Sequence, residues 1–148
     1  MHLVDTTIFF APHSGGVKRY LLSKQRFLAG QPGTRHSIVV PGAKKPAPSR
    51  HGVVELPCLT IPYGGGYRIP VSTRAWTNAL CDLQPDLIEA GDPYHVAWAA
   101  LDAADRMAVP AVAFVHSDLS RLLAMRFGTL AGAAIDRYLR RLYRRFDL

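Results

Sequence analysis

The sequence predicts an α/β domain in which a mostly parallel sheet lies between two layers of helices. Short apolar runs rich in β-branched residues alternate with amphipathic helical stretches along the whole chain. These runs are continuously apolar, which is typical of parallel strands buried on both faces. The chain has 148 residues, of which 49% are hydrophobic and 20% charged, and this balance suits one globular domain.

Four apolar runs predict strands of the parallel sheet, and a fifth segment predicts either one strand or two short ones. Prolines in the fifth segment place it near a sheet edge or at a bend. The four strands are expected at residues 6–11, 36–40, 85–90 and 109–115, and the fifth segment at 53–62.

Helices are expected wherever apolar residues recur at steps of three and four. They should cover residues 17–30, 71–83, 93–104 and 133–146, with one further helix that begins after Ser117 or Asp118 as its cap. Pro93 should lie in the first turn of its helix, and Gly128 and Gly132 should interrupt the helical pattern before the last one. Exposed or irregular loops are expected at 43–52 and 63–67.

Composition excludes several classes of protein. No apolar run approaches the roughly 18 residues that span a bilayer, and no basic and apolar leader opens the chain. The two cysteines, Cys58 and Cys81, are too few for a disulfide framework or a four-ligand zinc site, and the six histidines form no metal signature. We therefore expect no metal and no cofactor, and a location in the cell interior. The net charge of +7 allows nucleic acid, anionic lipid or phosphorylated small molecules as partners.

Unusual residues follow three of the predicted strands, in the loops 13–16, 91–94 and 116–118. In open α/β sheets, ligands bind outside the carboxyl ends of the strands. The three loops should therefore face one crevice.

The first of these loops places Gly15 and Gly16 at the start of a helix, with Lys18 just beyond. Bare backbone N–H groups at a helix N-terminus beside a cation suit a phosphate group. A tight turn between strand and helix explains the two glycines equally well. The spacing matches neither the dinucleotide fingerprint nor the P-loop.

Three acidic or histidine side chains at this edge carry separate hypotheses. His116 could contact a bound hydroxyl or transfer a proton, and the alternative is a neutral histidine bonded to backbone. Asp92 is expected to cap its helix. Glu89 lies within a buried strand, so it needs a partner or a ligand.

The last predicted helix has an apolar stripe and an arginine-rich remainder that includes Arg137, Arg141 and Arg144. The arginines could simply be solvated. They also form a plausible site for an anionic membrane surface. Nucleic acid is not expected, because there is no platform of interleaved aromatic residues and no reading helix.

Three segments together resemble a known family. Residues 10–21, 85–94 and 114–118 are similar, in order and spacing, to the corresponding parts of glycosyltransferases of the GT-B fold, family 4 type. The resemblance runs from the first strand to Phe146. It implies a Rossmann-like three-layer domain that forms the N-terminal half of a GT-B fold.

The resemblance also implies an activity and a set of roles. Such enzymes transfer a sugar from a nucleotide-sugar donor with retention of anomeric configuration and without a metal ion. The glycine loop, here Gly15 and Gly16 with Lys18 nearby, approaches the donor diphosphate, and His116 lies beside the reacting sugar. The N-terminal domain mainly recognises the acceptor. The candidates for that role here are Asp92, Tyr94 and Gly65, the last within the glycine loop 64–66.

One departure from the family qualifies this expectation. The family's second domain, which carries a pair of glutamates eight residues apart, has no counterpart in this sequence. Residues 1–148 are therefore expected to be one acceptor-side domain, truncated before the donor-binding domain and largely inactive alone. The alternatives are a stand-alone α/β module that binds a phosphorylated metabolite, or a domain that binds an anionic membrane. The expected location is cytoplasmic, with peripheral contact at the inner face of a membrane.

Overall fold

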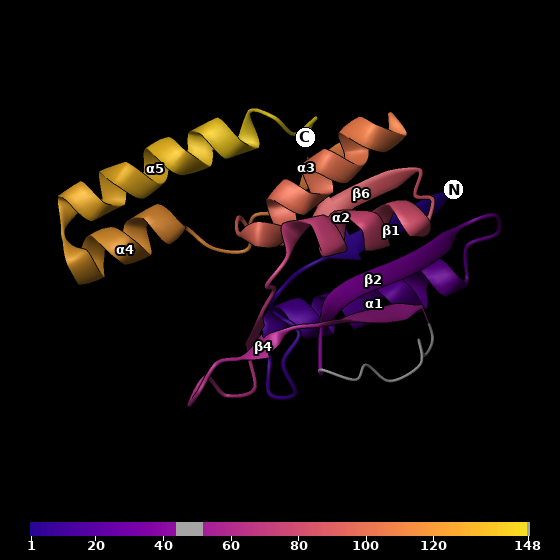
Figure 1. The fold of residues 1–148 in the computed structure, drawn as a ribbon, viewed down its shortest axis with the longest axis horizontal. Helices are drawn as coiled ribbons and strands as arrows, with labels where there is room; N and C mark the ends of the chain where they lie inside the picture. Colours follow the sequence, from indigo (N-terminus) through magenta and orange to yellow (C-terminus); the bar gives the residue numbers. More distant parts are fainter. Residues whose placement is uncertain (44–51, 148) are drawn as a thin grey trace.

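The computed structural model describes residues 1–43 and 52–147, and these form an α/β domain around one five-stranded sheet (Figure 1). The strand order is β3-β2-β1-β6-β7, and all neighbouring strands run parallel. The strands are β1 (His2–Thr6), β2 (Arg35–Gly42), β3 (Val53–Pro57), β6 (Leu87–Ala90) and β7 (Ala111–Ala113). The predicted parallel, Rossmann-like arrangement is confirmed.

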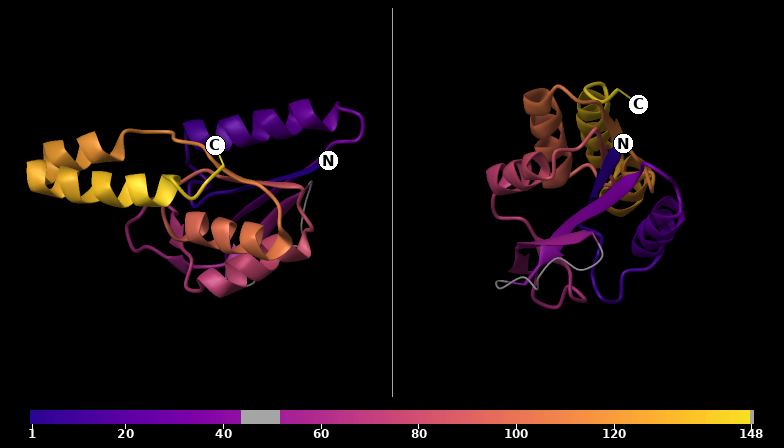
Figure 2. Two further views of the ribbon diagram at one scale, coloured as in Figure 1. Left: turned by 90° about the horizontal axis from the view of Figure 1, so that it is seen from above. Right: turned by 90° about the vertical axis from the view of Figure 1, so that its right-hand side faces the viewer.

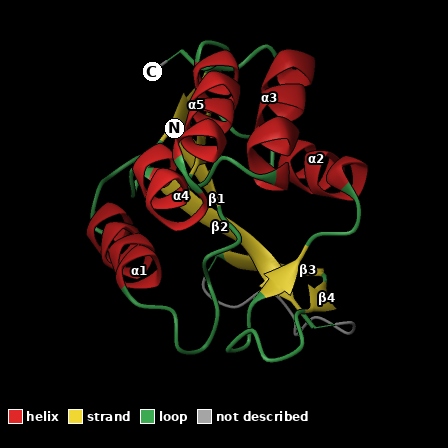
Figure 3. Cartoon of the chain, turned by 90° about the vertical axis from the view of Figure 1, so that its left-hand side faces the viewer, coloured by secondary structure: helices red, strands yellow, loops and turns green. Residues whose placement is uncertain are grey.

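Helices cover both faces of this sheet (Figure 3). Helix α1 (Gly16–Ala29) lies on one face, and α2 (Thr73–Asp82) and α3 (His95–Met107) lie on the other. Two more helices, α4 (Leu119–Phe127) and α5 (Thr129–Tyr143), follow the last strand.

Alternation along β2 divides the core into two clusters. Ile38 and Val40 pack with Leu21 of α1, whereas Val39 packs in the larger cluster with α2 and α3. Small residues fill much of α3, whose alanines are almost fully buried against β6 and β7. The larger core therefore lies on the α2–α3 face, and the α1 face has room for polar groups.

The first strand is four residues earlier than predicted. It runs from His2 to Thr6 rather than through residues 6–11. His2 and Asp5 conceal it in the sequence, because a buried strand with two ionisable side chains does not look apolar. Both side chains are satisfied across the sheet: His2 bonds to Ser37 and the carbonyl of Leu83, and Asp5 bonds to Lys24 and His36. Residues 7–15 form a loop instead.

Segment 53–62 takes the two-strand alternative. It forms β3 and then β4 (Leu59–Thr60), which pairs antiparallel with β5 (Arg68–Ile69). Residues 63–67 have no helix or strand, as expected. Most of the predicted 43–52 loop lies outside the described residues.

Two helix boundaries were predicted incorrectly. Pro93 lies before the N-cap of α3, which begins at His95. The last helix begins at Thr129, and Gly132 lies inside it rather than breaking it. Gly132 is needed there because an added Cβ would stand 2.6 Å from the Cβ of Ala124 in α4. Gly128, with φ +89°, is the residue that separates the two helices.

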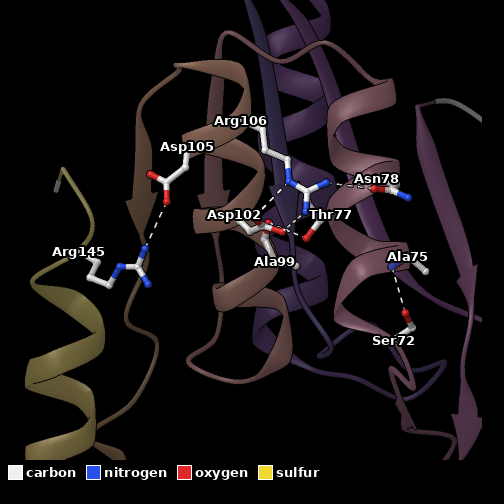
Figure 4. Close-up of polar contacts among 9 residues, drawn as sticks. All are labelled: Ser72, Ala75, Thr77, Asn78, Ala99, Asp102, Asp105, Arg106 and Arg145. Carbon is white, nitrogen blue, oxygen red and sulfur yellow. Dashed lines mark hydrogen bonds and ion pairs between the residues drawn. The ribbon is translucent and has the colours of Figure 1, made fainter.

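Polar contacts fix α3 to its neighbours (Figure 4). Arg106 of α3 bonds to Asp102 one turn earlier and to Asn78 of α2. Arg145, just after α5, pairs with Asp105 at 3.3 Å. These exposed contacts contribute little individually, and the buried alanine face of α3 supplies most of the attachment.

Candidate functional site

The loops that follow β1, β6 and β7 meet at one edge of the sheet. These three strands are adjacent and parallel, so their carboxyl ends lie side by side. The ladder also continues past the strand ends: Gly91 donates to the carbonyl of Thr6, and Phe114 donates to that of Ala90, each at 2.9 Å. Backbone hydrogen bonds therefore hold these loops next to one another, at the place where the sequence predicts a crevice.

Asp92 ties the first two of these loops together. Its carboxylate accepts hydrogen bonds from the Ile8 N–H at 2.7 Å and from the Thr7 hydroxyl at 3.0 Å, and a longer one from the Tyr94 N–H. The N-cap of α3 is Tyr94, so the prediction that Asp92 caps this helix is wrong. Asp92 instead holds the loop after β1 against the loop after β6.

Burial makes the Asp92 carboxyl group a weaker acid than an ordinary aspartic acid side chain. Removal from water raises its pKa to about 6, although the three donors and the nearby His95 act in the opposite direction. A carboxyl group that changes charge near pH 6 lies directly beneath the crevice.

His116 lies three residues beyond the end of β7, within a cluster of aromatic rings. Its ring is 4.5 Å from that of Phe114 and 6.0 Å from that of Tyr20 in α1, and Tyr20 and Phe114 stack at 5.0 Å. Partial burial lowers the pKa of His116 despite the opposing charge of Asp5. A neutral imidazole at neutral pH can donate or accept a hydrogen bond at a sugar hydroxyl.

A hollow of about 40 Å³ lies between the loops after β6 and β7. His116 and Asp92 line it, together with Phe9, Tyr94 and Tyr143. Ligand pockets usually measure about 300–1,000 Å³, so this hollow alone is too small to enclose a sugar. A wider hollow of about 790 Å³ lies at the opposite edge, between the amino ends of the strands and Leu83, and none of the predicted site residues lines it.

The glycine loop opens α1 as expected. Gly15 is the N-cap and makes no side-chain cap, and no described atom lies within 4 Å of where a Cβ would be on Gly15 or Gly16. The approach to the N-terminal N–H groups is open there. Lys18 turns back over its own loop, where its ammonium bonds to the Ala11 carbonyl at 3.3 Å and lies over the Phe10 ring.

Tyr94 contacts Phe9 at this edge, and Gly65 lies two residues before Tyr67, which also contacts Phe9. The Phe9 ring makes edge contacts at 6.0 Å with both Tyr94 and Tyr67. Gly65 lies in the turn before Tyr67, and a Cβ on its neighbour Gly66 would stand 3.1 Å from Pro12. All the residues named for donor, acceptor and catalytic roles therefore belong to loops or a helix start at the carboxyl edge.

A buried charge network lies below this edge, on the α1 face. Lys24 of α1 bonds to Asp5 of β1 and to Glu89 of β6, each at 2.9 Å, and His36 bonds to the other oxygen of Asp5. Burial and the charge of Asp5 raise the pKa of Glu89. Burial opposes the charge of Lys24, but the two carboxylates outweigh it and raise its pKa. Lys24 is thus the partner that the sequence required for Glu89.

Sequence reasoning missed the aromatic part of the site, which consists of Phe9, Tyr20 and Phe114. Each of these looked like an ordinary apolar residue of a strand or helix. A signal was present, since Tyr20 lies one helical turn after Gly16 and Phe114 two residues before His116. Across residues 1–43 and 52–147, no cluster of three or more His, Cys, Asp or Glu side chains could hold a metal ion.

This chain is similar to one protein family and to curated mannosyltransferases. The sequence model of Glycosyltransferase Family 4 matches residues 14–148. In two strains of Mycobacterium tuberculosis, a GDP-mannose-dependent alpha-(1-6)-phosphatidylinositol dimannoside mannosyltransferase is 36% identical over 100 residues, covering 62% of this chain. The chain spans about a quarter of the length of these curated relatives.

The family match contains every residue assigned above to donor, acceptor and catalytic roles, from Gly15 to His116. It also extends through α4 and α5, which lie beyond the sheet. The chain therefore belongs to Glycosyltransferase Family 4.

Proposed function

We propose that this chain is the N-terminal, acceptor-side domain of a retaining glycosyltransferase that uses a nucleotide-sugar donor. The observation that supports this most is the shared carboxyl edge of β1, β6 and β7. There an open helix N-terminus, a neutral histidine and a wall of aromatic rings come together.

The start of α1 suits the diphosphate of the donor. The first N–H groups of a helix have no intrahelical partner, and the helix dipole favours an anion there. Gly15 and Gly16 leave space for phosphate oxygens to approach these groups. Lys18 adds a positive charge in the first turn, and we propose that its ammonium leaves the Ala11 carbonyl to meet the phosphate.

His116 and the aromatic rings suit the sugar. Sugar rings present C–H faces and hydroxyl groups, which match an apolar wall and a hydrogen-bonding imidazole respectively. We propose that His116 positions the reacting sugar through a hydroxyl group. On the acceptor side we propose Tyr94, the loop around Gly65, and Asp92, which fixes the loop that carries Tyr94.

The donor and acceptor to test first come from the relatives. Their name specifies GDP-mannose and a phosphatidylinositol dimannoside. We propose a nucleotide-activated hexose as donor and a lipid-linked sugar as acceptor for the longer protein to which this domain would belong.

The small volume of the hollow supports the proposal that another domain forms the opposite wall of the cleft. At about 40 Å³ it cannot shield a sugar from water, and transfer to an acceptor other than water requires a closed site. We propose that a donor-binding domain downstream of residue 148 supplies the opposite wall.

The catalytic assignment is tested by His116→Ala in the enzyme that includes the downstream domain. Loss of a group that acts in the transition state should lower kcat by about 100-fold or more. His95→Ala is the control, because His95 is exposed at the start of α3. A rate for His116→Ala close to that of the unmodified enzyme would remove His116 from the mechanism.

The reaction class is tested by the product and by ligand binding. Nuclear magnetic resonance of the product should show the anomeric configuration of the donor. An inverted product would contradict the retaining mechanism. Micromolar binding of a simple sugar phosphate by the chain, with no transfer in any longer form, would instead favour a phosphorylated-metabolite module.

A further inference from the structure

Helices α4 and α5 form a hairpin that projects beyond the sheet (Figures 1 and 2). The carboxyl half of α5 is anchored to the domain: Leu142 is buried in the main core, and the Tyr138 hydroxyl donates to the Pro93 carbonyl at 2.7 Å. The other half of α5 and the whole of α4 pack mainly on each other, closely enough at Gly132 to exclude a side chain. We call residues 119–144 the hairpin.

The far end of the hairpin exposes large apolar side chains. Leu122, Met125, Phe127 and Leu130 are 55%, 77%, 65% and 86% exposed, and they lie within nine consecutive residues around the turn. No residue of α4 is buried. Large apolar side chains gathered on one exposed end of a protein mark a surface that binds something.

Positive charge lies next to this apolar end. Arg137, Arg141 and Arg144 follow Leu130 at steps of seven, four and three residues, so they share one side of α5 with it. This line is about 21 Å long, at 1.5 Å per residue. The hairpin carries six arginines and one aspartate, a net charge of +5 in a chain whose total is +7.

The three arginines of this line are unpaired within the part of the chain that the structure describes. Neighbouring arginines find carboxylates: Arg140 pairs with Asp136 at 2.7 Å, and Arg145 pairs with Asp105. In residues 1–43 and 52–147, no carboxylate lies within ion-pair distance of Arg137, Arg141 or Arg144. Their charges are available to an anionic partner.

We propose that the hairpin binds an anionic phospholipid surface, with its apolar end entering the headgroup region and Arg137, Arg141 and Arg144 on the lipid phosphates. Charge complementarity selects this partner. An exposed apolar end continuous with a straight line of free arginines suits a flat surface that is apolar below and anionic above. In the described residues no helix is long and apolar enough to cross a membrane, so the contact would be peripheral.

The attachment would bring the candidate site close to the lipid. Helix α4 begins at Leu119, three residues after His116, and its N-cap Asp118 accepts a hydrogen bond from the Arg121 N–H at 2.9 Å. The hairpin therefore grows directly out of the loop that carries His116. This proposal concerns binding alone and does not depend on the transferase activity proposed above.

The test measures co-sedimentation of the protein with vesicles. Vesicles of phosphatidylcholine with about one third phosphatidylglycerol should bind it, and vesicles of phosphatidylcholine alone should bind it at least about tenfold more weakly. Binding to the anionic vesicles should become weaker as the salt concentration is raised, because salt screens the attraction between the arginines and the lipid phosphates.

Two pairs of variants separate the two parts of the surface. Arg141→Gln with Arg144→Gln, and Met125→Gln with Leu130→Gln, should each weaken binding at least about tenfold. Arg26→Gln with Arg74→Gln removes the same charge from α1 and α2, and Phe27→Gln removes an apolar side chain of α1 that is 68% exposed. These controls should bind as the unmodified protein does. All four side chains changed in the hairpin are exposed, so folding should be retained, and circular dichroism checks it.

Several results would overturn the proposal. Equal binding to neutral and anionic vesicles would do so, and so would equal losses in the hairpin and control variants, which would indicate total charge alone. Self-association of the protein that is abolished by Met125→Gln with Leu130→Gln, without vesicle binding, would assign the apolar end to a second copy of the chain.

Discussion

The buried carboxylate of Asp92 holds two loops of the candidate site together. It accepts hydrogen bonds from the Ile8 N–H and the Thr7 hydroxyl, just after β1 ends. Without it, these two donors of the loop after β1, of which Thr7 is fully buried, would lose their partner. The position of Phe9, and of the rings that touch it, depends on this one side chain.

We predict that Asp92→Ala lowers the free energy of unfolding by about 1–3 kcal/mol, the usual cost of an unsatisfied buried donor. Asp92→Asn should recover most of this loss, because its amide oxygen can still accept from Ile8 and Thr7. Urea denaturation of the three proteins measures the difference. If Asp92→Ala is as stable as the unmodified protein, Asp92 does not hold the loops together.

The raised pKa of Asp92 also predicts a pH dependence. Its pKa is about 6 in the folded protein, above the 3.8 of an ordinary aspartic acid side chain, so the folded state binds the proton more tightly. The extra stability that comes from this tighter proton binding is therefore fully present below about pH 4 and is lost as the pH rises through about 6, whereas the hydrogen bonds from Ile8 and Thr7 remain. Relative to Asp92→Asn, the unmodified protein should become less stable over this range, and parallel curves would contradict the raised pKa.

For single residues, the sequence indicated which side chains need a partner but did not show which residues those partners are. Glu89 could be identified as needing a partner because a lone buried carboxylate is costly. Nothing in the sequence showed that the partner is Lys24, since 65 residues separate the two and only the fold brings α1 against β6. The role of Asp92 was misjudged for the same reason, because its partners lie 84 and 85 residues away.

Among the elements, α1 is attached to the sheet both by apolar packing and by a buried charge network. The apolar cluster between α1 and the sheet is small, and Lys24 of α1 forms ion pairs with Asp5 of β1 and Glu89 of β6. The same helix carries the glycine loop at its start and Tyr20 against His116. The network therefore fixes the helix that presents two parts of the candidate site.

We predict that Lys24→Met destabilises the protein by about 3–5 kcal/mol at neutral pH, because Glu89 loses its cation and Asp5 loses Lys24 but keeps His36 as a partner. Without Lys24, which opposes the rise, the pKa of Glu89 should rise further, so the folded state should bind the proton more tightly than the unfolded chain. The deficit should then shrink as the pH is lowered and Glu89 becomes neutral. Glu89→Gln in the same chain should restore part of the stability.

Thermal unfolding of these variants across pH measures the effect. Lys18→Met is the matched control, because Lys18 bonds to a backbone carbonyl rather than to a buried carboxylate. A deficit that is equal in the two variants, or that does not change with pH, would contradict the network.

The α4–α5 hairpin yields a prediction of its own. Gly132→Val should force the two helices apart, because the new Cβ would stand 2.6 Å from the Cβ of Ala124 and 3.1 Å from the Ser120 carbonyl. Overpacking of this kind costs about 1–3 kcal/mol. Amide hydrogen exchange should become faster in α4 and in the first half of α5 and stay unchanged in the sheet.

Ala133→Val is the control for that experiment. It adds a β-branched residue to the same turn of α5 at an exposed position, so it carries the helix-propensity cost without the clash. Similar exchange in both variants would show that the close approach at Gly132 does not hold the hairpin together.

The elements also show where pattern reasoning fails. Strands β2 and β6 were located almost correctly because they are apolar or end at clear turn residues. Strand β1 was misplaced because the apolar run 6–11 is more hydrophobic than the true strand, and tertiary pairing of His2 and Asp5 outweighs that local signal. Gly132 was taken for a breaker because its packing partner Ala124 cannot be inferred from spacing.

In the whole molecule, positive charge and apolar packing are concentrated in different parts. Most of its net positive charge lies on the projecting hairpin, and its apolar core lies around α3. The candidate site is shallow: its hollow measures about 40 Å³, and Gly15, Gly16 and His116 are exposed. The family and the loops of the site could be predicted from the sequence, because short motifs identify them. The depth of the site could not be predicted in this way.

We predict that residues 1–148 alone transfer sugar at no measurable rate. The glycine loop and His116 can supply only some of the contacts to a nucleotide sugar, and a half-open site neither aligns the acceptor nor excludes water. Release of sugar from a radiolabelled nucleotide-sugar donor to a lipid acceptor measures this, with the longer gene product as the positive control. The chain should instead bind the acceptor weakly, and Tyr94→Ala should abolish that binding while leaving the fold intact by circular dichroism. Robust transfer by residues 1–148 would mean that the carboxyl edge of this sheet is a complete active site, and the proposed second wall would have to be abandoned.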